Sequence, residues 1–131
     1  MAEVLIPADD EAALVRELSD RMDVHVGTRI PNPRPAEFIR VVGTGGTARD
    51  LVTDQPVLDI EGFAETEGAA RYLTAAAIGH AQAAGRAGSL GGVTCYGVTA
   101  VSLPANLPMP SVPTHFRYTA KIQPDLRRVR A

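Results

Sequence analysis

The sequence contains no tryptophan, one cysteine and only three phenylalanines among 131 residues. One thiol cannot form a disulfide within the chain, so the fold must be held together by packing. Cys95 lies in a stretch of strand-forming residues, and we expect it to be a small buried apolar side chain rather than a reactive thiol. Because aromatic residues are so few, the core is left to Ala, Val, Leu and Ile.

Long apolar runs and a strong excess of one charge are also missing. No stretch approaches the roughly 20 apolar residues that span a bilayer, and residues 1–10 carry acids instead of the basic start of a signal peptide. The formal net charge is -2, with both signs spread along the chain. No basic field would therefore draw the protein to nucleic acid. We expect no membrane partner, and the charge argues against a DNA-binding protein.

Residue patterns for metal binding are absent from the sequence. The histidines His25, His80 and His115 fall in different segments, and no Asp, Glu or Cys stands at ligand spacing to any of them. His80 falls on the apolar side of a predicted helix near its end, where an imidazole can interact with terminal carbonyls. We therefore expect no metal and no other cofactor.

Patterns for catalysis are missing too. Asp59 and Glu61 would share one face of a strand, but acid–base chemistry needs burial to separate their pKa values, and this face is predicted to be exposed to solvent. Residues 43–47 (Gly-Thr-Gly-Gly-Thr) could cradle a phosphate, but they lack the Lys and Ser/Thr of a P-loop and the helix after it. No serine has the surroundings of a nucleophile elbow. We predict no catalytic residues and no enzyme activity.

The length suits one compact domain over residues 1–131, whose basic end, residues 124–131, is expected to be flexible. Asp9 and Asp10 can cap a first helix on which Leu14, Leu18 and Met22 recur every four residues. Alternating apolar residues and β-branched residues predict five strands, at about 24–30, 37–42, 57–64, 93–101 and 114–123.

The connections between these strands are rich in proline and glycine. Residues 31–35 hold three prolines and are expected to be a surface connector, and the glycines of 43–47 are expected to break the second strand and form a hairpin tip. Residues 103–113 hold four prolines and predict a long loop between the last two strands, longer than an ordinary hairpin turn.

A second, alanine-rich helix is predicted from about residue 66 to 84, ended by Gly85 and Gly88. Its packing face is predicted to be a stripe of four residues, Ala69, Leu73, Ala76 and His80, flanked by Tyr72, Ala77 and Ala84. Ile78 would lie on the opposite, exposed face beside Arg71, where it could contact another chain.

The order helix, three strands, helix, two strands predicts an α+β fold. We expect a mostly antiparallel five-stranded sheet with two helices packed on one face and a long proline-rich loop between the last two strands.

Several segments, taken in order, resemble the tail-terminator (tail-completion) family of long-tailed phages. They are residues 38–41 leading to 44–46, residues 51–56, residues 60–64 with the alanine-rich helix after them, and residues 92–94, 104–108 and 116–119. None of these segments is a catalytic signature, so the resemblance depends on their order and spacing across most of the chain.

This resemblance implies a virion structural protein. A six-membered ring of such subunits would cap the head-proximal end of the tail tube, stop tube polymerisation and offer a joining surface to head-completion and neck proteins. The protein would then be located in the neck of the virion after assembly in the host cytoplasm. Its partners would be other copies of itself, the tail tube protein and the neck proteins, and DNA would only pass through the lumen.

A ring joins two different patches of each subunit, so we expect interface residues on projecting elements and on a charged face of the sheet. They are Thr44, Gly45, Gly46 and Arg49 at the hairpin tip; Arg71 and Ile78 on the second helix; Leu107 and Met109 in the long loop; Arg127 and Arg128 at the basic end; and Asp59, Glu61 and Arg117 on the sheet. Asp59 and Glu61 could face arginines of a neighbouring subunit, drawn from Arg29, Arg40 and Arg117.

Two other readings remain open from the sequence. The nearest is another neck component, such as a head-completion or adaptor protein, which would also be small, ring-forming and poor in motifs. The other is a small ligand-binding or enzymatic α+β domain that uses the glycine loop at 43–47, which would require a pocket with converging polar groups.

Overall fold

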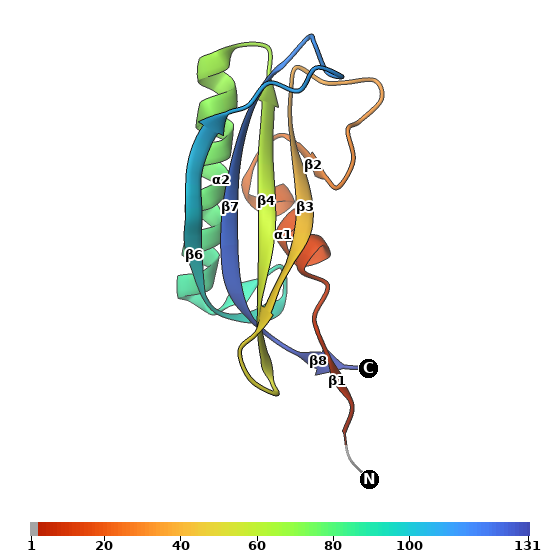
Figure 1. The fold of residues 1–131 in the computed structure, drawn as a ribbon, viewed down its shortest axis with the longest axis vertical. Coiled ribbons are helices and arrows are strands. Elements are labelled where there is room, and N and C mark those ends of the chain that lie inside the picture. Colours follow the sequence, from red (N-terminus) through yellow and green to blue (C-terminus); the bar gives the residue numbers. More distant parts are fainter. Residues whose placement is uncertain (1–2) are drawn as a thin grey trace.

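The computed structural model, which describes residues 3–131, contains a curled mixed sheet with two helices on one of its faces and a small ribbon formed by the chain ends (Figure 1). The elements in chain order are β1 (Leu5–Ile6), α1 (Asp10–Arg21), β2 (His25–Gly27), β3 (Glu37–Ala48), β4 (Thr53–Ala64), α2 (Glu67–Ala87), β5 (Ser89–Leu90), β6 (Val93–Asn106), β7 (Phe116–Arg127) and β8 (Val129–Arg130). The predicted α+β class is confirmed.

The main sheet has six strands in the order β2-β3-β4-β7-β6-β5, and β1 pairs with β8 in a separate two-stranded sheet. Only β2 and β3 run parallel; the other neighbours are antiparallel. The prediction of five strands is therefore wrong in detail. The strand predicted at 24–30 shortens to three residues, because the loop over residues 28–36 leaves the sheet at Gly27 and carries the chain back to start β3 beside β2.

Helix α1 forms as its sequence predicts. The side chain of Asp9 accepts a hydrogen bond from the backbone N–H of Ala12 at 3.0 Å, which satisfies one free donor of the first turn. Leu14 and Leu18 are fully buried against the sheet. Each of these leucines contributes about 1.5–3 kcal/mol through burial.

Helix α2 begins at its cap Thr66 and ends at Gly88, whose φ of 92° is left-handed. Its buried face is rotated from the predicted one: Leu73, Ala77 and Ala84 are buried as predicted, but Ile78 is buried too and Tyr72 is 72% exposed. The contact with Gly62 of β4 explains the rotation. A Cβ on Gly62 would lie 2.3 Å from the hydroxyl oxygen of Thr74, so the absent side chain lets Thr74 approach the sheet. The proposal that Ile78 is an exposed contact is therefore wrong.

The opposite face of the sheet holds a second, smaller core. Phe38 and Phe63 stack with ring centroids 4.6 Å apart, and Val112 packs against them. These side chains are covered by the loops over residues 28–36 and 107–115, which lie together at one end of the sheet (Figure 1). The prediction that this face of β4 is exposed to solvent is wrong at this end, since Phe63 is fully buried and Glu61 is 6% exposed.

The glycines at 43–47 do not break the strand. β3 continues through them to Ala48, and its pairing with β4 shifts register between Gly43 and Gly46, which is a β-bulge. The hairpin turn lies further on, at residues 49–52, where the Asp50 carboxylate accepts hydrogen bonds from the N–H groups of Val52 and Thr53 at 2.9 and 2.8 Å. The hairpin predicted here is present, but its tip is displaced toward Leu51.

The last two strands pair as a hairpin, as predicted, but both are longer than expected. β6 continues through Pro104 to Asn106, which shortens the connecting loop to residues 107–115. An outer strand tolerates proline because the missing N–H can point away from the sheet. In the stretch 124–131, residues 124–127 end β7, where Leu126 is buried, and residues 129–130 form β8.

Candidate functional site

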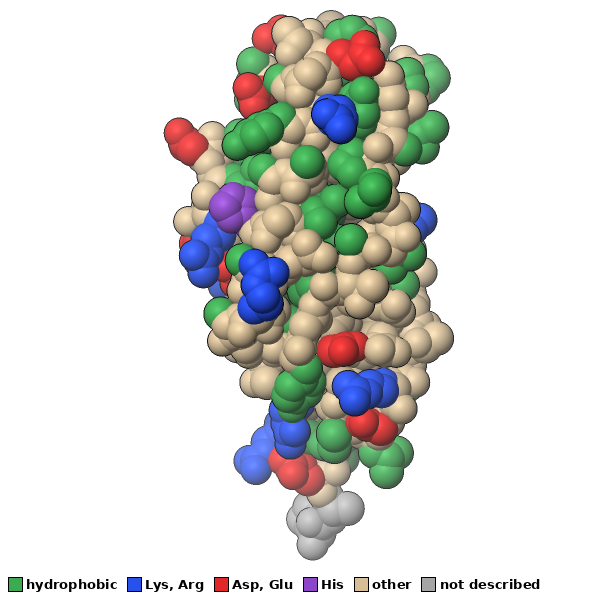
Figure 2. Space-filling model, turned by 90° about the vertical axis from the view of Figure 1, so that its left-hand side faces the viewer, with side chains coloured by type: hydrophobic (Ala, Val, Ile, Leu, Met, Phe, Trp, Pro, Cys, Tyr) green, Lys and Arg blue, Asp and Glu red, His purple; other side chains and the backbone are tan. Residues whose placement is uncertain are grey.

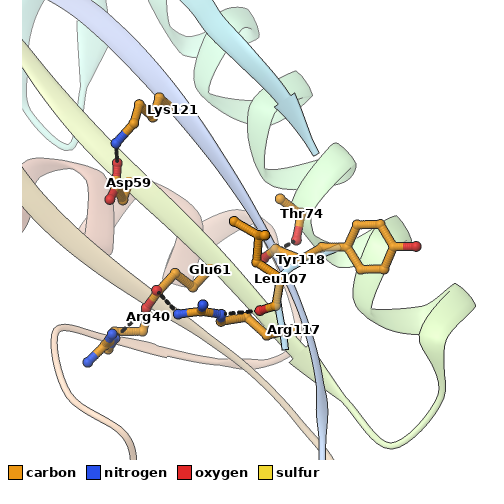
Figure 3. A network of polar contacts seen from close by, with 8 residues as sticks. All are labelled: Arg40, Asp59, Glu61, Thr74, Leu107, Arg117, Tyr118 and Lys121. Carbon is orange, nitrogen blue, oxygen red and sulfur yellow. Dashed lines mark hydrogen bonds and ion pairs between the residues drawn. The ribbon is translucent and has the colours of Figure 1, made fainter. Parts of the chain in front are cut away.

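Glu61 lies at the centre of a charged cluster on the sheet face that carries no helix (Figure 3). Its carboxylate pairs with Arg40, the residue opposite it on β3, and with Arg117 of β7. The Arg117 Nη1 lies 2.8 Å from the Glu61 Oε2. The three side chains are 8%, 24% and 17% exposed. Removing one partner of such a partly buried pair lowers the stability of the fold by more than an exposed ion pair contributes. The remaining charge loses its counter-ion without regaining full hydration.

Arg117 connects this cluster to the loop over residues 107–115. Its Nε donates a hydrogen bond to the backbone carbonyl of Leu107 at 2.6 Å, while the Leu107 N–H donates to the Arg117 carbonyl at 3.1 Å. His115 ties the other end of the loop to the 28–36 loop, with Nε2 2.8 Å from the Pro35 carbonyl. Because a carbonyl only accepts, Nε2 carries the proton in this contact. The cluster therefore holds the loop on the sheet.

Lys121 and Asp59 face each other across β7 and β4 and form an ion pair at 2.5 Å (Figure 3). The sequence anticipated that Asp59 and Glu61 meet basic residues, but placed those residues on a neighbouring subunit. In the structure both acids find their partners within one chain. Arg29, the third arginine considered, lines a shallow groove with Arg40 instead.

The β3–β4 hairpin projects from the other end of the sheet (Figure 1). Thr44 bonds through its hydroxyl to the Val57 carbonyl at 3.1 Å, and Gly45 and Gly46 form the bulge with φ of 97° and 116°. These three residues shape the strand rather than its tip. Leu51 at the tip is 88% exposed, but it is not among the four tip candidates that the sequence offers, Thr44, Gly45, Gly46 and Arg49. Arg49 lies 3.8 Å from Asp125.

A groove of about 500 Å³ runs beside this bulge. It lies between the segment before α1, the glycines of β3 and the end of the chain, and its charged lining is Asp10, Glu11, Asp54 and Arg128. Glu11 accepts a hydrogen bond from the Gly43 N–H at 2.7 Å, and Arg128 is paired with Asp54. Burial is the main cause that raises the pKa of Asp10 above its usual range. Three acids against one paired arginine make the groove a poor phosphate site.

The remaining interface residues predicted from the sequence lie on different parts of the molecule. Leu107 is 50% exposed at the end of β6, whereas Met109 is partly buried against the phenylalanine cluster. Arg71 is exposed in the first part of α2. Arg127 is exposed and donates to the Tyr96 hydroxyl at 3.3 Å, while Arg128 is held by Asp54. The structure therefore does not bring all candidates into one site.

The outer edge of β6 is a further surface that sequence reasoning missed. In the described part of the chain, β5 pairs only with residues 93 and 94, so no strand covers the edge beyond them. Three register shifts leave extra residues on this strand: Tyr96, Val101 and one of the pair Leu103 and Pro104. Tyr96, Val101 and Leu103 are 52%, 50% and 75% exposed. We call residues 95–106 the β6 edge.

The β6 edge carries no charged side chain, since β6 as a whole lacks Asp, Glu, Lys and Arg. Figure 2 looks onto this side of the molecule, where charged side chains gather toward the ends and margins and leave an uncharged zone between them. Natural edge strands are usually protected by charges, proline or bulges. Here the bulges interrupt the strand but present apolar side chains, so the edge suits side-chain contact better than strand addition. The sequence signal for this surface was the absence of charged residues from all fourteen positions of β6.

Comparison with known proteins adds no relative. A scan against protein-family models finds no match, and a search of curated protein sequences finds no significant match. Within residues 3–131, no helix is long and apolar enough to cross a membrane. The same residues contain no cluster of three or more His, Cys, Asp or Glu side chains that could hold a metal ion.

Proposed function

We propose that this protein is a tail-terminator subunit of a long-tailed phage, a structural virion protein without enzyme activity. Six copies would form a ring that caps the head-proximal end of the tail tube, ends its polymerisation and offers a surface to head-completion and neck proteins. The protein would be located in the neck region of the virion after assembly in the host cytoplasm. DNA would pass through the ring without being bound as a ligand.

The observation that carries this proposal is the position of two segments that resemble the family. Residues 51–56 include the tip of the β3–β4 hairpin, and residues 104–108 lead into the loop at the opposite end of the sheet (Figure 1). Each presents an exposed leucine: Leu51 is 88% exposed and Leu107 is 50% exposed. Apolar side chains on projecting elements at opposite ends favour a protein that meets different partners at its two ends.

The polar clusters favour the same interpretation. Both oxygens of Glu61 are occupied by arginines, and the Asp59 carboxylate is paired with Lys121. These groups hold strands and a loop in place rather than converging on a cavity. The groove beside Gly45 and Gly46 is lined by acids, which disfavours the alternative of a phosphate-binding domain.

Electron microscopy tests the proposal. Tail tube protein from the same presumed phage is polymerised with and without the chain, and tube ends and lengths are scored in negative stain. We expect rings at one end of each tube and arrested growth when the chain is present. A Leu51→Asp variant tests the hairpin tip, and Tyr72→Asp on the exposed side of α2 is the matched control.

The competing identity as a neck adaptor gives a different outcome. Tubes would remain uncapped and would grow to unlimited length, while the chain would be found on the portal of separated heads. That result would replace the terminator proposal with a head-completion or adaptor function. Uncapped tubes together with no binding to heads would argue against both.

A further inference from the structure

The two chain ends form a short antiparallel ribbon that projects beyond the sheet (Figure 1). We call residues 3–6 and 129–131 the terminal arm. Leu5 pairs with Arg130 and Ile6 with Val129, and the N–H of Ala131 donates to the carbonyl of Val4 at 3.0 Å. Two-stranded ribbons are marginally stable in water on their own. The ribbon of this protein consists of only two residue pairs.

The terminal arm exposes apolar side chains that its own chain does not cover. Val4, Ile6 and Val129 are 64%, 42% and 39% exposed. Its charged side chains, in contrast, are paired with each other, because Arg130 contacts Glu3. The arm is therefore apolar with its local charge neutralised, which suits an uncharged surface on a partner.

The root of the arm is fixed to the body of the molecule. Arg128 donates hydrogen bonds to both oxygens of Asp54 at 2.9–3.1 Å, and its backbone N–H donates to the Val52 carbonyl at 2.8 Å. This bidentate pair sets the direction of the arm before any partner arrives. Docking a preorganised element loses less conformational entropy than docking a flexible tail.

The arm and the β6 edge lie on opposite sides of the sheet (Figure 1). At the root of the arm, Pro7, Ala8 and Arg128 line a groove together with the bulged part of β3. β6 is separated from β3 by both β4 and β7. The arm of one copy therefore points away from its own β6 edge, but a neighbouring copy can present that edge to it.

We infer that the terminal arm of one copy docks onto the β6 edge of a second copy, so that chains join head to tail. The partner is identified by matching polarity: the arm's outward side chains are apolar and its charged side chains are paired. The β6 edge has no charged side chain of its own and exposes Tyr96, Val101 and Leu103, and the neighbouring charges of Arg127 and Glu67 contact its two ends, at Tyr96 and Asn106. A contact between two different patches builds a ring when its rotation closes and a filament when it does not. The inference rests on the proposed function only in assigning this contact to a ring.

Cysteine cross-linking of the purified full chain tests the contact. Ile6→Cys and Leu103→Cys place thiols on the arm and on the β6 edge, and the native Cys95 is buried, so the unmodified chain gives the background. Under mild oxidation we expect a cross-linked dimer when the two variants are mixed and none when either is alone. The double variant is expected to give a ladder of multimers.

Ala83→Cys is the matched control because Ala83 is exposed on α2, a helix that belongs to neither surface. A mixture of Ile6→Cys with Ala83→Cys is expected to give no cross-linked dimer. Ile6→Asp or Leu103→Asp is expected to abolish the association of the chain in light scattering, with circular dichroism showing that each variant is folded.

Three results would overturn the inference. Cross-linking of Ile6→Cys alone would mean that arms meet each other across a two-fold axis, and cross-linking of Leu103→Cys alone would mean the same for edges. A chain that stays monomeric at high concentration and never cross-links would exclude docking between copies. Because this assay contains no tail tubes, its failure leaves tube capping to be judged separately, and a failure to cap tubes leaves the cross-linking result standing.

Discussion

The carboxylate of Asp54, near the start of β4, holds the guanidinium of Arg128 through hydrogen bonds to both of its oxygens, across 74 positions of sequence. The two side chains are only 13% and 24% exposed. This pair joins the point where the chain leaves β7 to the base of the β3–β4 hairpin. The hairpin and the terminal arm, two projecting elements, are therefore oriented by one ion pair.

Replacing Asp54 with Ala is expected to lower the free energy of unfolding by about 1–3 kcal/mol, because the Arg128 guanidinium loses a bidentate, partly buried partner. Urea unfolding measures the change. A double-mutant cycle with Arg128→Ala should show coupling between the two residues, since the second change removes the group that the first left unpaired. Additive effects would mean that the pair does not orient the arm.

Glu61 should be the most sensitive charged position on the open face of the sheet. Glu61→Gln removes the negative charge between Arg40 and Arg117, and we expect a loss of about 2–3 kcal/mol. This lies below the usual 3–5 kcal/mol for buried pairs because both arginines keep some contact with water. Asp59→Asn is the matched control: its partner Lys121 is 45% exposed, so the loss should stay under about 1 kcal/mol. Equal losses of stability in the two variants would contradict the distinction between the buried Glu61 pairs and the exposed Asp59 pair.

Local pattern was sufficient for much of the fold. Asp9 with Leu14 and Leu18 fixed the position of α1, because a capping residue and a four-residue apolar repeat act within one helix. The phase of α2 was missed because the stripe was drawn through His80. Its true face depends on Gly62, more than ten residues away on β4, which gives Thr74 room to approach the sheet.

The candidate surfaces were harder to predict because they depend on contacts distant in sequence. Glu61 alternates with apolar residues as an exposed position would, but its carboxylate pairs with Arg40 and Arg117, and Arg117 also holds the loop that carries Leu107. Leu103 lies in a segment whose prolines suggest a loop, yet the strand continues through it. Whether a strand lies at an edge is decided by the order of strands in the sheet, which no single strand encodes.

The glycines of the β3 bulge offer a test of backbone geometry. Gly45 and Gly46 both have positive φ, but a Cβ on Gly45 would meet nothing within 4 Å, whereas one on Gly46 would lie 2.3 Å from the Gln55 carbonyl oxygen. Gly45→Ala should cost about 1–2 kcal/mol from backbone strain alone. Gly46→Ala should cost clearly more, because the β3–β4 pairing must also shift. Thermal unfolding of the two variants measures the difference, and equal melting temperatures would argue against the bulge.

The junction between α1 and the turn before β6 should make stability depend on pH. Glu17 is 8% exposed, and its carboxylate accepts hydrogen bonds from the Gly91 N–H at 3.0 Å and from Arg21 at 2.8 Å. Burial opposes ionisation of this carboxyl, but the bonds from Gly91 and Arg21 outweigh it and lower the pKa of Glu17 below its usual value of 4.5. The unfolded chain thus binds the proton more tightly than the folded chain does.

A lowered pKa in the folded state adds stability that is fully present above the unfolded value and is lost as pH falls through the folded value. We expect Glu17→Gln to lower the free energy of unfolding by about 1–3 kcal/mol at pH 7, since it removes charge-assisted bonds. The gap between the variant and the unmodified chain should narrow steadily below about pH 4.5, as the unmodified chain loses the same charge. Urea unfolding at a series of pH values measures this gap, with the exposed Glu65→Gln as the control for removing one negative charge. A gap that stays constant down to pH 3 would show that Glu17 stabilises the junction by packing rather than by its charge.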